Sequence, residues 1–199
     1  LGLMIFGEDS SLVLVFLTVI AFFPIVYGAI KMEENKDMTM SNEWKLLKEH
    51  SKALSFFMFL FLGIVFSYSL WYTFLPLDMS QTAFLIQSKT IARINGHATG
   101  NFIESLNDFS DIFFNNIKVM IFCLLFAFLY GVGAIFILVW NASVLGTAIG
   151  NFSRNIISKF AAVTGNLSLS QYFQAFSLGI FRYSLHGIPE ILAYFIAGL

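Results

Sequence analysis

Four long apolar stretches constrain the fold of this chain more than any other feature. They cover residues 11–30, 54–75, 119–140 and 176–199. Because a helix rises about 1.5 Å per residue, about 20 apolar residues cross the hydrocarbon core of a bilayer. Hydrophobic residues make up 58% of the chain and charged residues only 12%, which is more apolar surface than a soluble domain of this size buries. We therefore predict an all-α, polytopic transmembrane helix bundle that forms a single integral membrane domain.

Lysine placement predicts which connections face the cytoplasm. The densest basic cluster lies between the first two apolar stretches and consists of Lys31, Lys36, Lys45, Lys48 and Lys52. Since cytoplasmic connections of membrane proteins are enriched in Lys and Arg, we assign residues 31–53 to the cytoplasm. Residues 76–116 are then extracytoplasmic, and residues 152–175, which carry Arg154 and Lys159, return to the cytoplasm. The expected location is the plasma membrane, as a multi-pass protein.

Two connections also contain patterns of interfacial helices. The sequence SNEWKLLKEHSKAL starts at Ser41, a good helix cap, and has apolar residues on one face, which predicts a helix on the membrane surface. In the outer connection, apolar residues recur at helical spacing over residues 103–113, with polar residues between them. We expect a short amphipathic helix there.

The third apolar region is too long for one straight span. No charged residue occurs from residue 119 to residue 149, so the chain must tilt strongly or break, and the WNAS sequence at residues 140–143 is the expected break. Ala142, Gly146 and Gly150 follow at intervals of four. Small residues at this spacing allow membrane helices to approach closely, which predicts a packed or re-entrant segment.

The last apolar stretch carries the strongest candidate site. Arg182, His186 and Glu190 lie four residues apart, and Tyr194 extends the series by one turn, so on a helix they form one stripe. Ionisable groups in a membrane helix are costly and persist where they pair, face the bundle interior or line a wet cavity. Two interpretations remain open: an interhelical clamp, with Arg182 extending to the interface, or a functional site.

The sequence argues against several classes of function. No catalytic motif of hydrolases, metalloproteases or nucleotide-binding proteins is present, so we predict a non-enzymatic protein without catalytic residues. His186 and Glu190 supply at most half of a metal site, and we predict no metal and no cofactor. The net charge of −1 disfavours nucleic acid as a partner. The single cysteine, Cys123, lies in an apolar stretch and is interpreted as a packing residue.

Several motifs resemble the stage II sporulation protein M family, and most closely its archaeal branch. They are the Asn pair before the third span, the sequences YGVGAIF and WNASVLG, and the terminal HGIPEILAYFIAGL. The matching positions, together with neighbouring small residues expected to pack helices, are Asn115, Asn116, Gly131, Gly133, Asn141, Gly146, Gly150, Gly187 and Pro189, in addition to His186 and Glu190. The resemblance spans most of the chain, from about residue 11 to residue 199.

The resemblance implies a scaffold or anchor for a membrane-associated complex. Sporulation members of the family act in the membrane with hydrolases that remodel the cell wall, whereas archaeal members have no comparable assigned role. Members carry helices on both sides of the segment matched here, and the chain opens on Leu1, so we expect a piece of a longer protein. We predict a bilayer-embedded protein with an extracytoplasmic protein partner bound through residues 76–116, and homo-oligomers are compatible with the sequence. The alternative is a secondary transporter or channel that uses the His186 and Glu190 pair, with one helix interrupted at Gly187 and Pro189 and another broken at WNAS, as in carriers with discontinuous spans.

Overall fold

The chain folds as a bundle of long helices. The computed structural model describes residues 5–39, 43–96, 117, 121 and 132–198. The elements in this part are η1 (Gly7–Asp9), α2 (Ser10–Thr39), α3 (Glu43–Phe74), α4 (Leu77–Ala83), α5 (Leu85–Gly96), α7 (Val132–Thr164) and α8 (Leu169–Gly198), with no strand among the described residues. The predicted all-α class is confirmed.

Three helices of the described part are long and apolar enough to cross a membrane, judged by length and composition. Their apolar stretches are Ser10–Glu33 in α2, Ser51–Phe74 in α3 and Ile135–Thr164 in α7. Many large apolar side chains of these helices point outward, such as Phe59 and Phe66 in α3. Outward-facing apolar side chains of this kind suit a lipid environment. The chain is therefore an integral membrane protein built as a helical bundle.

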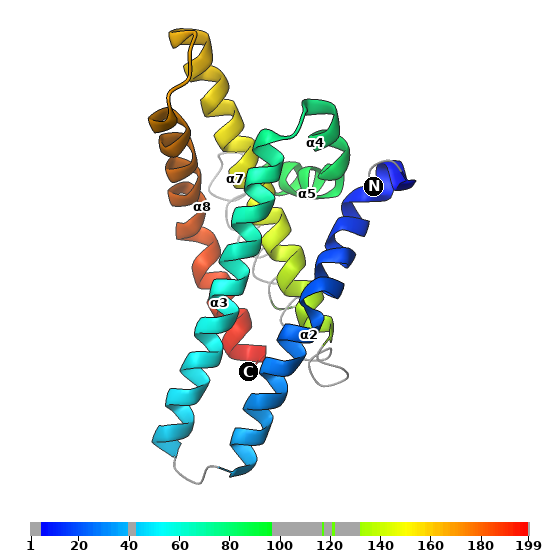
Figure 1. The fold of residues 1–199 in the computed structure, drawn as a ribbon, viewed down its shortest axis with the longest axis vertical. Coiled ribbons are helices and arrows are strands. Elements are labelled where there is room, and N and C mark those ends of the chain that lie inside the picture. The colour runs from blue at the N-terminus through cyan, green and yellow to red at the C-terminus, as the bar shows by residue number, and fades with distance from the viewer. Residues whose placement is uncertain (1–4, 40–42, 97–116, 118–120, 122–131, 199) are drawn as a thin grey trace, which may run out of the picture.

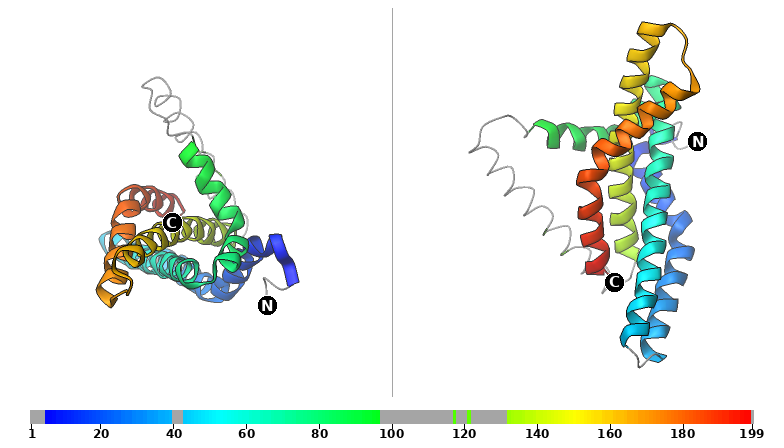
Figure 2. Two further views of the ribbon diagram at one scale, coloured as in Figure 1. Left: turned by 90° about the horizontal axis from the view of Figure 1, so that it is seen from above. Right: turned by 90° about the vertical axis from the view of Figure 1, so that its left-hand side faces the viewer.

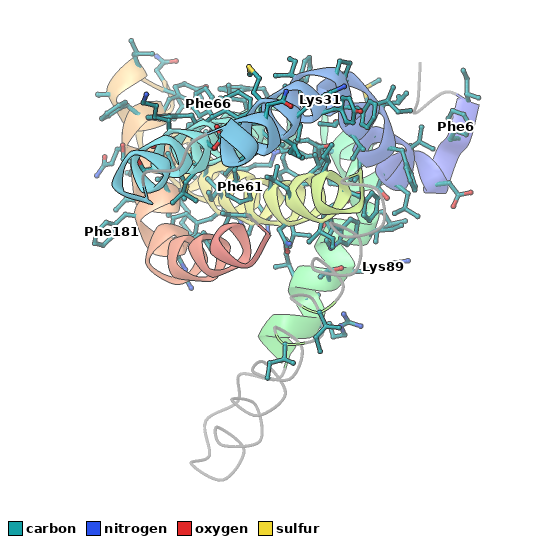
Figure 3. The ribbon with its side chains drawn as sticks, turned by 90° about the horizontal axis from the view of Figure 1, so that it is seen from below. Phe6, Lys31, Phe61, Phe66, Lys89 and Phe181 are labelled. Atoms are coloured by element: carbon teal, nitrogen blue, oxygen red, sulfur yellow. The ribbon has the colours of Figure 1, made fainter. Side chains whose placement is uncertain are left out.

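The helices are arranged around α3 and α7, which lie side by side along the long axis (Figure 1). The backbone around Gly146 of α7 meets Val65 and Tyr68 of α3, and one turn later Gly150 meets Tyr72. Because the residue numbers rise together, the two helices run parallel. The core between the helices contains Phe61, which is 1% exposed and faces inward in Figure 3.

The α2 and α8 helices flank this pair and run in the opposite direction. Phe16 of α2 lies 5.2 Å, centroid to centroid, from Phe136 of α7. At the far end of the bundle, the long helices α2 and α3 are joined by the lysine-rich connection, where Lys31 lies. We call the opposite end, formed by α4 and the last turn of α3, the α4 end.

Helix α5 leaves the α4 end almost at right angles to the bundle axis (Figure 2). It has two exposed cations, Lys89 and Arg93, and one fully buried polar side chain, Gln87. The predicted outer helix at residues 103–113 lies outside the described residues. The interfacial structure that the described part contains is α4 and α5, which the sequence analysis did not predict.

The third span differs from its prediction of residues 119–140. Helix α7 begins at Val132, and its apolar stretch starts at Ile135; residues 122–131 lie outside the described part. The expected break at WNAS is absent, because α7 continues through it to Thr164. Both polar side chains there bond to the preceding turn: Asn141 Nδ2 donates to Ile137 O at 3.0 Å, and Ser143 Oγ donates to Trp140 O at 2.7 Å. Polar groups that bond to their own helix do not require a break.

The expected surface helix before the second span also differs. Residues 43–74 form one continuous helix, α3, which starts near the end of α2, and the two helices diverge toward the α4 end (Figure 1). Helix α2 likewise continues to Thr39, beyond the predicted end at residue 30, with Pro24 inside it. At about 1.5 Å per residue, both helices exceed the hydrocarbon thickness of about 30 Å. The lysine-rich connection is therefore held by extended helices and not by a separate surface helix.

The last helix, α8, is continuous from Leu169 to Gly198. The predicted interruption at Gly187 and Pro189 is thus absent from its backbone. Ser168 precedes the helix and forms a capping box with Gln171, whose Oε1 accepts the Ser168 N–H at 2.8 Å. Gly165, with φ of +72°, makes the tight turn between α7 and α8. The predicted polar connection of residues 152–175 is therefore a helical hairpin.

The structure also changes the predicted topology. Arg154 of α7 bonds to Thr73 and Ser80 at the end of α3 and in α4. The start of the 76–116 segment and the 152–175 segment consequently lie at the same end of the bundle, whereas the sequence analysis assigned them to opposite sides of the membrane. The physical reason is the shifted third span: α7 runs parallel to α3, so both helices end on the same side.

Candidate functional site: the polar α4 end

Arg154 is the centre of the α4 end. Its Nε and one terminal nitrogen donate to Thr73 O at 3.2 and 3.0 Å, and its other terminal nitrogen donates to Ser80 Oγ at 2.8 Å. A further bond goes to Leu75 O. The guanidinium carbon also lies 5.4 Å from the centroid of the Tyr72 ring. We call this set of contacts the Arg154 cap.

The sequence explains why the end of α3 needs such a cap. A helix leaves its last carbonyls without intrahelical donors, and glycine or asparagine after the helix often provides the missing bonds. Here the segment after Tyr72 is Thr-Phe-Leu-Pro, and Pro76 has no backbone N–H. Arg154 supplies the donors from another helix, and its positive charge also suits the negative end of the helix dipole.

Close contact between α3 and α7 puts Arg154 in reach. A Cβ on Gly150 would lie 2.7 Å from Tyr72 Cβ and 2.8 Å from Ser69 O, and one on Gly146 would lie 2.7 Å from Tyr68 Cβ. Only glycine allows this approach. Thr73 Oγ1 then donates to Gly150 O at 3.2 Å across the interface, so backbone proximity and polar contacts support each other.

A second polar contact ties α5 to α7. Gln87 and Ser143 are both 0% exposed, and Gln87 Nε2 donates to Ser143 Oγ at 3.4 Å. The other amide atom, Gln87 Oε1, is buried without a hydrogen-bond partner. Ser10 Oγ at the start of α2 donates to Thr82 O in α4 at 3.3 Å. The α4 and α5 helices are thus attached to the bundle through polar groups of α2 and α7.

The α7–α8 hairpin forms the third component of the α4 end. Ser153 Oγ donates to Ala175 O at 3.3 Å, and Gly179 packs on Ile149 and Ser153. Beyond these contacts the hairpin extends past α4 (Figure 1). Its tip carries three exposed apolar side chains: Val163 at 85%, Leu169 at 86% and Phe173 at 76% exposure.

Of the predicted polar stripe, the structure describes the side chain of Arg182. This arginine is exposed, and its guanidinium carbon lies 5.2 Å from the Phe152 centroid and 5.9 Å from the Tyr183 centroid. The backbone of His186, Glu190 and Tyr194 belongs to the continuous helix α8, so the four-residue spacing places them along one side. Their side chains lie outside the described part, and the interhelical clamp stays a prediction.

The predicted family and packing residues fall into three groups. Gly146, Gly150 and Asn141 lie in α7, with the two glycines at the α3 contact. Gly133 lies in the first turn of α7, and Gly187 and Pro189 lie within α8, where the structure describes the helix course alone. The remaining predicted positions, Asn115, Asn116 and Gly131, lie outside the described residues, as does Cys123.

Arg154 and Ser80 are the residues that the sequence analysis missed, having used Arg154 only as a marker of the cytoplasmic side. The available signal was a helix that ends before a proline without a glycine or asparagine cap, together with one arginine after a long charge-free stretch. In the Arg154 cap, the guanidinium is bonded to protein oxygens and lies against an aromatic ring. No group of three or more His, Cys, Asp or Glu side chains within the described part could hold a metal ion.

Comparison with known proteins places this architecture in a family. A family model described as stage II sporulation protein M matches residues 52–199, which is more than half of the chain. The match covers α4, α5, α7 and α8 and the part of α3 from residue 52 onward, and therefore includes the whole Arg154 cap. No curated protein and no solved structure matches the chain.

Proposed function

This chain belongs to the stage II sporulation protein M family, and we propose that it is a non-enzymatic membrane scaffold that binds a protein partner through its α4 end. The observation that carries the proposal is the apolar tip of the α7–α8 hairpin. The tip lies about ten residues beyond Arg154 along α7, or about 15 Å at 1.5 Å per residue. The apolar stretch of α7 runs on to Thr164, but that of α3 ends at Phe74, beside the Arg154 cap. We take the end of α3 as the edge of the hydrocarbon layer, which places the tip outside it.

An apolar surface in a polar environment indicates a binding surface for protein. Val163, Leu169 and Phe173 are the most exposed large apolar side chains at this end. The hairpin beneath them is held by the bond between Ser153 and Ala175, and α8 is joined to α3 by ring contacts of Phe74 with Tyr172 and Phe176 at 5.9 and 6.1 Å. A rigid support for an exposed apolar tip is what a scaffold requires.

The side of the membrane follows from the lysine distribution. The last turns of α2 and the first turns of α3 hold five lysines, and we propose that this end of the bundle faces the cytoplasm. The α4 end then faces outward, at the plasma membrane, and its partner is extracytoplasmic. The partner surface combines the described part of the originally expected segment, α4 and α5, with the α7–α8 hairpin.

The alternative of a transporter or channel has less support from the described helices. It rested on two broken helices beside ionisable groups, the arrangement of carriers with discontinuous spans. Both α7 and α8 are continuous. The buried Gln87, whose Oε1 has no partner, is the observation that favours a polar path.

The test is purification of the full-length protein from its native membrane, with mass spectrometry of what accompanies it. The wild type is compared with a tip variant, Val163→Ser with Leu169→Ser and Phe173→Ser, and with a control, Ser158→Ala, at an exposed polar position of α7. We expect a stoichiometric partner with the wild type and the control, lost from the tip variant. If the wild type purifies without a partner and carries solute across liposome membranes in a way that depends on Gln87, the transporter interpretation replaces the scaffold.

A further inference from the structure

The α7–α8 hairpin has an unusual charge distribution. Between Val132 and Pro189 the sequence contains Arg154, Lys159 and Arg182 but no aspartate or glutamate. Arg154 is bonded to protein oxygens in the Arg154 cap. Two cations of the hairpin, Lys159 and Arg182, are therefore available for another anion, and neither has an acidic neighbour on its own hairpin before Glu190.

Arg182 lies on an aromatic support. Its guanidinium carbon is 5.2 Å from the centroid of Phe152, and the ring of Tyr183 lies 6.3 Å from that of Phe152 at 82°. Within the described part, no hydrogen bond or ion pair of the guanidinium is found. A guanidinium that stacks on a ring keeps its in-plane N–H groups free for a phosphate oxygen.

The depth of Arg182 corresponds to the membrane interface. Helix side chains point toward the N-terminus of their helix, and the N-terminus of α8 is at the α4 end. The guanidinium consequently reaches up toward Phe152, two residues before Arg154, and away from His186 and Glu190. Long arginine side chains extend to the interface in this way and leave their apolar stems in the hydrocarbon.

Lys159 lies on the same face of α7 as the aromatic support. Phe152, Asn155 and Lys159 are three and seven residues apart, which places them along one stripe of the helix. Lys159 is about 10 Å further from the membrane centre than Phe152, and both Asn155 and Lys159 are exposed. Since helix side chains point toward the N-terminus of their helix, the Lys159 ammonium can approach an anion at Arg182 from the α4 side.

The surface beside this position is apolar. Leu178, Ile180 and Phe181, within one turn before Arg182 in α8, are all exposed, Phe181 at 68%, and Figure 3 shows Phe181 pointing away from the bundle. Cations next to an exposed apolar helix surface match the two parts of a phospholipid. The acyl chains cover the apolar side chains, and the phosphate meets the cations.

We propose that Arg182, Lys159 and Phe152 form a binding site for the phosphate group of an anionic phospholipid. The site lies on the opposite side of α7 from the Arg154 cap and does not depend on the proposed protein partner. Its occupant is a lipid and not free phosphate, because the apolar surface of α8 contributes to binding. The site would couple the position of the α7–α8 hairpin to the lipid composition of the membrane.

The test uses the full chain in detergent with added lipid. Native mass spectrometry counts bound lipid, and thermal unfolding measures stabilisation, with phosphatidylglycerol, with phosphatidylcholine, and with inorganic phosphate alone. We expect tight binding of phosphatidylglycerol only. Arg182→Gln should weaken it about tenfold and Phe152→Leu, which keeps the charge, about threefold. Lys31→Gln removes one charge at the opposite end and should change the affinity less than twofold.

Three results would overturn the proposal. Equal binding of phosphatidylglycerol by the wild type and Arg182→Gln would exclude Arg182 as the ligand. Equal weakening by Lys31→Gln and Arg182→Gln would reduce the effect to general charge attraction. Stabilisation of the wild type by inorganic phosphate that matches the effect of phosphatidylglycerol would show a free anion site. If Arg182→Gln does not fold, the affinity of Phe152→Leu for phosphatidylglycerol is compared with that of the wild type instead, and equal binding would exclude the site.

Discussion

Arg154 belongs to α7, and Arg182 of α8 contacts α7 through Phe152 near the same level. The surroundings of the two arginines differ. Arg154 is half-buried, and protein oxygens accept four hydrogen bonds from its guanidinium. Arg182 is exposed and contacts two aromatic rings. Neither arginine has a carboxylate partner among the described residues. The partners of each guanidinium therefore indicate its role: Arg154 holds the protein together, and Arg182 is available for a ligand.

This comparison also separates the two sides of α7. On the α3 side, glycines and backbone carbonyls create a close and fully bonded contact. On the α8 side, the contacts include a bond from Ser153, the packing of Gly179 and the rings of Phe152 and Tyr183, and the hairpin ends in an exposed apolar tip. A rigid attachment on one side and an accessible surface on the other are consistent with the scaffold that we propose.

Replacing Arg154 gives the largest expected effect. Arg154→Gln removes most donors from the carbonyls of Thr73 and Leu75, and we expect a loss of about 3 kcal/mol in the free energy of unfolding. Arg154→Lys keeps the charge but not the planar fork, so its loss should be intermediate. Unfolding in mixed detergent, followed by circular dichroism, measures both. A loss below about 1 kcal/mol for Arg154→Gln would contradict the structural role.

The close contact that positions the cap comes next. Gly150→Ala introduces a Cβ that would lie 2.7 Å from Tyr72 Cβ, and we expect a loss of about 2 kcal/mol, since overpacking forces the helices apart. Gly63 of α3 is a matched control, because a Cβ there meets nothing within 4 Å. Gly63→Ala should be neutral or stabilising by up to about 1 kcal/mol. The same unfolding assay applies, and equal effects of the two variants would refute the contact.

Arg182 should matter much less for stability. In neutral detergent without anionic lipid, Arg182→Gln loses a stacking contact at an exposed site, and we expect a change of less than about 1 kcal/mol. The measurement is a thermal melt in parallel with Arg154→Gln. A loss for Arg182→Gln as large as that for Arg154→Gln would remove the distinction between the two arginines.

Replacing Gln87 gives the smallest expected change in stability, because its buried amide is only partly hydrogen-bonded, in contrast to the Arg154 guanidinium. One of its amide atoms is bonded to Ser143 and the other has no partner. Gln87→Leu removes both polar atoms, while Ser143 Oγ keeps its bond to Trp140 O. We therefore expect a change within about 1 kcal/mol in a thermal melt. A larger loss would mean that a polar molecule binds Gln87 Oε1.

The helices α2 and α3 show what an apolar sequence predicts well. Their spans follow directly from stretches of bilayer length, and the predicted membrane bundle was correct. Their ends were not predicted, because α2 continues to Thr39 and α3 begins at Glu43, through polar residues that give no hydropathy signal.

The α7 helix shows where sequence reasoning failed. No charge marks its start over residues 119–149, so α7 was not separated from the apolar residues before it, and a break was assigned to WNAS. Local bonds of Asn141 and Ser143 to their own helix cannot be distinguished in sequence from bonds that interrupt one. The Arg154 cap was missed for a related reason: its partners are 74 to 81 residues away in the chain.

The central claim is that the α4 end, and above all the hairpin tip, contacts a protein partner. The most direct measurement is photocrosslinking in the native membrane, with a photoreactive amino acid at Phe173 or, as a control, at Phe59, which faces outward from the middle of α3 and is 75% exposed. We predict a discrete adduct with another protein from position 173 and none from position 59. Adducts with lipid alone at both positions would contradict the claim.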